Sequence, residues 1–178
     1  HSDFYLDNQS ELIDQLLKLK KEGSKKILLL GVSFALLELA ETSSLNLSDV
    51  IVMETGGMKG RRKELVREEL HQILCRRLNV KSVFSEYGMT ELMSQAYSLG
   101  KGCYNCPPWL RIVLRDINDP FALEKQGKVG GINIIDLANF YSCAFIETHD
   151  LGRKAQNGSF EVLGRMDNSD VRGCNLLI

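Results

Sequence analysis

The sequence has 178 residues and a mass of 20.0 kDa, which fits one ordinary domain, or one domain with a small appendage. Lys and Arg total 22 and Asp and Glu total 23, so the formal net charge of -1 argues against a nucleic-acid-binding or anionic-membrane protein. No apolar run approaches the roughly 18–20 residues that a membrane span needs. The chain starts with His1-Ser2-Asp3-Phe4, which is neither a signal peptide nor a native start, so we expect a piece of a longer protein. Five cysteines at irregular spacing, without a secretory signal, predict reduced thiols in a cytoplasmic protein.

The first half of the chain predicts alternating helices and strands. Asn8 and Glu11 have the spacing of a capping box, and the apolar stripe behind them predicts a helix that ends near Gly23. Residues 27–30 form a continuous apolar run, which suits a strand buried on both faces of a parallel sheet. The next expected elements are a helix over 33–40, a strand over 50–53, a helix over 61–78 and a strand over 80–85. This alternation indicates an α/β fold class with a layer of parallel strands.

The second half predicts short strands separated by turns. The candidate strands are 110–114, 131–135, 144–148 and 159–163, and the turn residues are Asn118-Asp119-Pro120, Gly130-Gly131 and Asn157-Gly158. Asn157-Gly158 is typical of a two-residue hairpin turn. We expect three parts: an α/β half-domain over 1–98, a small β-rich subdomain over 99–164, and a tail over 165–178.

The strongest local motif is Tyr87-Gly88-Met89-Thr90-Glu91, between an expected strand and an expected helix. Gly88 permits a tight turn and a close backbone approach to a ligand. Thr90 would place a hydroxyl at a helix start, where free N–H groups favour anions. Glu91 could bind a hard cation such as Mg²⁺. An ordinary strand-to-helix turn capped by threonine would have the same pattern.

Three further segments are candidates for ligand contacts. Thr55-Gly56-Gly57-Met58-Lys59-Gly60 follows an expected strand, where open α/β sheets bind ligands, and its glycines offer a flat surface for a planar base; a plain flexible loop is the alternative. Asp150 ends an expected strand and could accept two hydrogen bonds from a ribose diol. Arg165 could form bidentate bonds to phosphate or ribose oxygens. We expect His71 to face solvent, and Trp109 and Phe140-Tyr141 to belong to the core.

Together and in this order, these segments resemble the adenylate-forming superfamily of acyl-CoA synthetases, luciferases and peptide-synthetase adenylation domains. The resemblance runs from about Ile27 to the end. It implies an ATP/AMP site in which Thr90 contacts phosphate and Glu91 holds Mg²⁺. Gly56, Gly57 and Met58 would stack on the adenine together with the Tyr87-Gly88-Met89 segment, and Asp150 and Arg165 would bind the ribose. Gly127-Lys128-Val129-Gly130-Gly131-Ile132 is similar to the superfamily's Gly-Glu-x-Gly-Glu-Leu strand turn, with both glutamates replaced.

The end of the chain is most similar to the acyl-protein synthetases of bacterial bioluminescence, the long-chain-fatty-acid–luciferin-component ligases. In those enzymes a fatty acid is activated as its adenylate, and the acyl group passes to a cysteine near the C-terminus and then to a fatty-acid reductase partner. Cys174 matches that position, so the resemblance implies an acyl-accepting thiol there, beside Arg172. A small buried cysteine on an apolar tail is the alternative.

The sequence also departs from the superfamily. The upstream phosphate-binding loop and the C-terminal lid with its catalytic lysine are absent, so we expect the second half of an adenylating core that is inactive alone. Two other functions stay open: a coenzyme A ligase of the phenylacetate type, and a non-catalytic adenine-nucleotide-binding module. Cys103 and Cys106 have a spacing that also suits zinc, for which two more ligands would have to converge.

Overall fold

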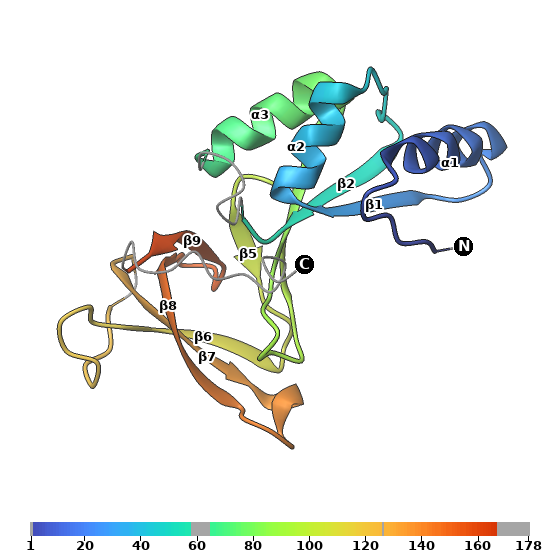
Figure 1. Cartoon of the computed structure of the whole chain (residues 1–178). Coiled ribbons are helices and arrows are strands. Elements are labelled where there is room, and N and C mark those ends of the chain that lie inside the picture. The colour runs from blue at the N-terminus through green and yellow to red at the C-terminus, as the bar shows by residue number, and fades with distance from the viewer. Residues whose placement is uncertain (1, 58–64, 126, 167–178) are drawn as a thin grey trace.

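A computed structural model describes residues 2–57, 65–125 and 127–166 of the chain. Its first half alternates helices and strands, and its second half is almost entirely β (Figure 1). The elements of the first half are α1 (Gln9–Glu22), β1 (Ile27–Val32), α2 (Ser33–Thr42), β2 (Val50–Thr55), α3 (Arg67–Leu78) and β3 (Phe84–Tyr87). Those of the second half are β4 (Ala96–Ser98), β5 (Cys103–Asn105), β6 (Leu110–Arg115), β7 (Val129–Asp136), the short 3₁₀ helix η1 (Leu137–Asn139), β8 (Phe145–Lys154) and β9 (Phe160–Arg165).

The described strands form one mixed sheet in the order β1-β2-β3-β4-β5-β9-β8-β7-β6. β1, β2 and β3 are parallel, and every later pairing is antiparallel. This confirms the predicted α/β fold class, with a parallel layer followed by a β-rich region. No described helix is long and apolar enough to cross a membrane.

The helices form largely where the apolar pattern predicts them. α1 ends at Gly23, whose φ of 62° lies in the left-handed region that favours glycine. The predicted capping box is wrong, because Asn8 makes no cap bond to the backbone and instead donates to the Glu11 carboxylate at 2.6 Å. α3 begins only at Arg67, and residues 58–64 lie outside the described part. The third strand starts at Phe84 rather than at residue 80.

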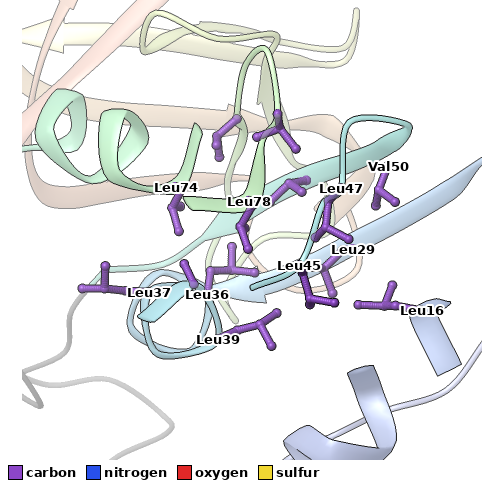
Figure 2. Close-up of a cluster of buried hydrophobic side chains, with 14 of the residues drawn as sticks. Leu16, Leu29, Leu36, Leu37, Leu39, Leu45, Leu47, Val50, Leu74 and Leu78 are labelled. Carbon is purple, nitrogen blue, oxygen red and sulfur yellow. The ribbon is translucent and has the colours of Figure 1, made fainter. Parts of the chain in front are cut away.

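The first core lies under the three helices, all on one side of β1 and β2 (Figure 1). Figure 2 shows the leucines of α2, α3 and the 45–47 segment gathered over these strands. In β1 only Leu29 is buried, at 8% exposure, whereas Leu28 and Leu30 are 56% and 49% exposed. The expectation that 27–30 is buried on both faces is therefore wrong for the described residues, because no described element covers the second face.

The second core lies between β3–β5 and the long strands of the second half, and its largest buried side chains are Tyr104 and Phe160. This core also includes Leu92 and Ala96, which precede the expected boundary near residue 98. The division of the chain into three parts stays a prediction. Gly130 and Gly131 lie inside β7 rather than in a turn, because β7 packs there against Arg115.

Several aromatic residues lie outside the cores. Phe140 and Tyr141 are 76% and 99% exposed and Trp109 is half exposed, so the expectation that they are core residues is wrong. These residues lie in connections beyond the strand ends, where an apolar side chain has no described layer of the fold to pack against.

Candidate functional site

The first two predicted segments meet at the carboxyl ends of β2 and β3. Thr55 and Glu86 are register partners, and the Thr55 hydroxyl donates to the Glu86 carboxylate at 3.1 Å. Gly56 and Tyr87 therefore follow on neighbouring strands. Gly56 has a φ of 67°, a conformation that favours glycine, and both Gly56 and Gly57 are exposed. Met58 lies outside the described residues.

Tyr87 connects this strand end with β8. Its hydroxyl donates a hydrogen bond of 2.7 Å to Asp150, and its ring makes edge contacts with Tyr104 and Phe160 at 5.9 and 5.5 Å. Burial and the neighbouring Asp150 carboxylate raise the pKa of Tyr87 above its usual range, so the phenol stays a proton donor. The structure thus joins a residue predicted to contact adenine with one predicted to bind ribose.

Asp150 and Arg165 are register partners on β8 and β9. The Arg165 Nε lies 3.8 Å from the second Asp150 oxygen, and the arginine side chain is half exposed. The next residue, Met166, is fixed by a 2.7 Å hydrogen bond from its amide to the His149 carbonyl. Both predicted ribose contacts therefore lie together on two adjacent inner strands, and both side chains are at least partly accessible to solvent. Cys174, the predicted acyl acceptor, lies outside the described residues.

The segment after Tyr87 differs from the expectation. Gly88, Thr90 and Glu91 are exposed, and the Leu92 amide closes a turn on the Met89 carbonyl at 3.0 Å. The chain then enters β4 without forming a helix, so the prediction that Thr90 begins a helix is wrong. Met89 packs against the second core.

Glu91 offers an accessible carboxylate, and Mg²⁺ commonly takes only one or two carboxylates together with substrate phosphates. The donor set thus fits a magnesium ion that is bound jointly with a nucleotide. Within the described residues, no three or more His, Cys, Asp or Glu side chains converge to hold a metal alone. The Cys103 and Cys106 pair thus finds no further zinc ligands in that part of the chain.

A buried polar cluster, which the sequence analysis missed, lies beside the Gly56 segment. The Glu54 carboxylate accepts from Ser33 at 2.8 Å, and Arg67 and His71 lie 3.4 and 3.6 Å from its other oxygen. Ser33 also donates to the Gly56 carbonyl at 3.3 Å, which links the cluster to the loop. His71 is mostly buried, so its expected solvent-facing position is wrong.

Burial alone would raise the pKa of Glu54, but hydrogen bonds from His71, Ser33 and Ser85 and the charge of Arg67 together lower it. Arg67 also donates to the Val162 carbonyl at 3.2 Å and lies 5.3 Å from the Tyr104 ring centre. It thereby ties α3 to the second half. In the sequence, the only sign of this cluster is Glu54 itself, an acidic residue directly after the apolar run 50–53.

Comparisons with known proteins show which solved structures share the fold of this chain. No protein-family model matches the sequence, and no curated protein matches it significantly. Among solved structures, ATP-bound MatB from Rhodopseudomonas palustris superposes with a TM-score of 0.61 at 18% identity, covering 86% of this chain and 33% of that chain. O-succinylbenzoate coenzyme A synthetase (MenE) from Bacillus subtilis gives 0.62 at 19%, covering 93% and 37%. A benzoate CoA ligase from Burkholderia xenovorans gives 0.55 at 17%, covering 79% and 31%.

The chain therefore has the fold of one part of these ligases and spans about a third of their length.

Proposed function

We propose that this chain is part of an enzyme that uses ATP to activate a carboxylic acid as its acyl-adenylate. The observation that carries the proposal is a chain of contacts: Gly56 follows β2 beside the end of β3, Tyr87 at that end binds Asp150, and Asp150 pairs with Arg165. Segments up to 109 positions apart are thereby linked, which supports a shared nucleotide site. The ATP-bound and CoA-ligase structures that share the fold support the same reading.

In this proposal each residue has one task. The Gly56-Gly57 backbone and the Tyr87 segment contact the adenine, while Asp150 and Arg165 bind the ribose. Thr90 contacts the phosphates, and Glu91 binds the Mg²⁺ that neutralises their charge. The Tyr87 hydroxyl holds one Asp150 oxygen, so the carboxylate is oriented before the ribose binds.

The acid would bind in an apolar groove of about 560 Å³ beside the Glu91 segment. Its lining is mainly apolar and includes Met93, Tyr97, Leu99, Cys106, Pro107 and Trp109. An apolar lining fits an acid with a hydrocarbon or aromatic tail better than an acid with a charged tail, because burying hydrocarbon surface is favourable.

The acyl group would then pass to Cys174. Its thiolate attacks the carbonyl carbon of the acyl-adenylate, the carbon–sulfur bond forms, and the bond to the phosphate oxygen breaks as AMP leaves with the electron pair. An acyl-accepting protein such as a fatty-acid reductase would be the next partner, in the cytoplasm. Transfer to coenzyme A instead is the second candidate, favoured by the CoA-ligase neighbours.

The test is an intact mass measurement after exposure of the chain to a preformed fatty acyl-adenylate, because this substrate needs no upstream phosphate-binding residues. We expect a hydroxylamine-sensitive acyl adduct on the wild type that is absent from Cys174→Ser. Equal adducts on both proteins, or none, would remove Cys174 from the mechanism. If neither AMP nor MgATP binds in calorimetry, the adenylation proposal itself is refuted. Binding of AMP without any acyl transfer to Cys174 or coenzyme A favours a nucleotide-binding module.

A further inference from the structure

The exposed turn that carries Glu91 is held from the second half of the chain. Residues 88–95 form no helix or strand, so the neighbouring β-sheet ladders do not fix their backbone. Besides the bond between Leu92 and Met89 within the turn, Glu91, Met93 and Ser94 are bonded from one corner of the fold, where β7 runs into η1. The polar side chains of that corner are Asp136 and Asn139, which had no role in the sequence analysis.

Asp136 is fully buried at 0% exposure, and hydrogen bonds from neighbouring donors satisfy its carboxylate. Its carboxylate accepts the backbone amides of Met93 and Ser94, each at 2.9 Å, and the Ser94 hydroxyl at 2.7 Å. A fourth bond comes from the Ala138 amide at 3.1 Å. Because a buried carboxylate is costly unless it is hydrogen-bonded, the turn must keep its shape for Asp136 to stay satisfied.

Asn139 holds Glu91 itself. The asparagine is 5% exposed, and its amide nitrogen donates to the Glu91 carbonyl at 2.7 Å and to the Cys143 carbonyl at 2.9 Å. Its amide oxygen accepts from the Ser142 hydroxyl. Every polar atom of the side chain therefore has a partner, and one of these bonds fixes the backbone of the residue whose carboxylate faces solvent.

Trp109 offers a way to observe this turn. Its indole nitrogen donates to the Ser94 hydroxyl at 3.0 Å, so it contacts the same residue that Asp136 binds. It is the only tryptophan in the sequence and is half exposed, so the fluorescence of the protein's tryptophan comes from this one position beside the turn.

We propose that Asp136 and Asn139 are positioning residues for Glu91. They fix the backbone of residues 91–94 from a buried corner, so that the Glu91 carboxylate is already in place when a magnesium-bound nucleotide arrives. The inference rests on the proposed function, because it assigns the metal to Glu91. Its consequence is specific: loss of either residue should weaken binding that needs the metal and leave binding of the nucleoside unchanged.

The experiment compares Asn139→Asp and Asp136→Asn with the wild-type 178-residue chain. Asn139→Asp sets a carboxylate against two carbonyl oxygens, and Asp136→Asn sets an amide against backbone donors, while both keep the side-chain size. Calorimetry measures the Kd for MgATP and for adenosine. We expect each variant to bind MgATP roughly tenfold more weakly and adenosine within about twofold of the wild type. The change in Trp109 fluorescence on adding MgATP should shrink accordingly.

Ile134→Val is the matched control, because Ile134 is buried in the same strand and makes no polar contact with the turn. It should lose some stability and keep both affinities. Ligand-free hydrogen exchange of the 89–95 amides gives an independent readout, and we expect faster exchange there in the two polar variants only.

The outcomes separate the two proposals. Unchanged exchange at 89–95, or equal weakening of MgATP and adenosine, would overturn the positioning role even if the wild type binds nucleotides normally. A wild-type chain that binds MgATP no more tightly than adenosine would instead refute the metal role of Glu91. In that case the proposed function fails at this residue, and the positioning inference fails with it.

Discussion

The Tyr87 hydroxyl donates a 2.7 Å hydrogen bond to Asp150, although β3 and β8 are not neighbours in the sheet. Three strands, β4, β5 and β9, lie between them. In a flat sheet, four strand spacings would separate the two residues by about 19 Å. The sheet must therefore curl between its two halves, and this curvature creates the candidate nucleotide site.

The Tyr87–Asp150 bond gives a first prediction. Tyr87→Phe keeps the ring packed on Tyr104 and Phe160 but leaves Asp150 without its donor. We expect about 1–2 kcal/mol lower unfolding free energy, because a bond to a charged acceptor is lost. Urea unfolding measures the loss, with fully exposed Tyr141→Phe as the control. Equal stability of the two variants would contradict an anchoring role for the Tyr87 hydroxyl.

The buried Glu54 cluster predicts a pH dependence of stability. Because the folded protein holds the pKa of Glu54 below its ordinary value of 4.5, the native state binds fewer protons than the unfolded chain. The contribution of Glu54 is therefore present above that value and is lost as the pH falls toward the lower folded pKa. Unfolding free energies measured from pH 7 to pH 3 should fall less steeply for Glu54→Gln.

The exposed Glu68→Gln removes the same charge without touching the cluster. It should keep the wild-type slope. If Glu54→Gln also keeps that slope, Glu54 is not held ionised by its neighbours.

Adjacent leucines of β1 give a third prediction. Leu29 points into the first core and Leu28 into the uncovered face. We expect Leu29→Ala to lower the unfolding free energy by about 2–4 kcal/mol, through lost burial and a cavity. Leu28→Ala should cost less than about 1 kcal/mol, because that side chain is already half exposed. Equal losses in denaturant titrations would show that the second face is covered in solution.

Gly131 gives a fourth prediction. A Cβ added there would lie 2.5 Å from the Arg115 guanidinium carbon. The guanidinium is buried and cannot easily move, since it donates to Asn133 at 2.7 Å and to the Thr148 carbonyl at 2.8 Å. Gly131→Ala should therefore cost about 1–3 kcal/mol by overpacking. Gly57→Ala, where an added Cβ meets nothing within 4 Å, serves as the stability control in thermal unfolding.

Local patterns predicted much of the fold. The apolar runs over 27–30 and 50–53 are strands, and the stripe behind Asn8 is a helix. Asn157-Gly158 does lie between β8 and β9, but the connection spans residues 155–159 and is not the predicted two-residue turn. The two short strands β4 and β5 were missed, because three residues are too few for periodicity to identify. The helix expected after Glu91 failed because Asp136 and Asn139 supply the bonds that stabilise a turn there instead.

The sequence by itself determined the α/β order and the strand-end glycines, because these depend on composition and spacing along short segments. The residues proposed to contact the nucleotide come from the resemblance of short motifs to the adenylate-forming superfamily. Only the tertiary structure decided which of them meet. The contact between Tyr87 and Asp150 follows from the curl of the sheet, and the buried carboxylates of Glu54 and Asp136 are satisfied by donors from distant segments. Such contacts depend on the positions of segments in space, and no local pattern of apolar and polar residues encodes them.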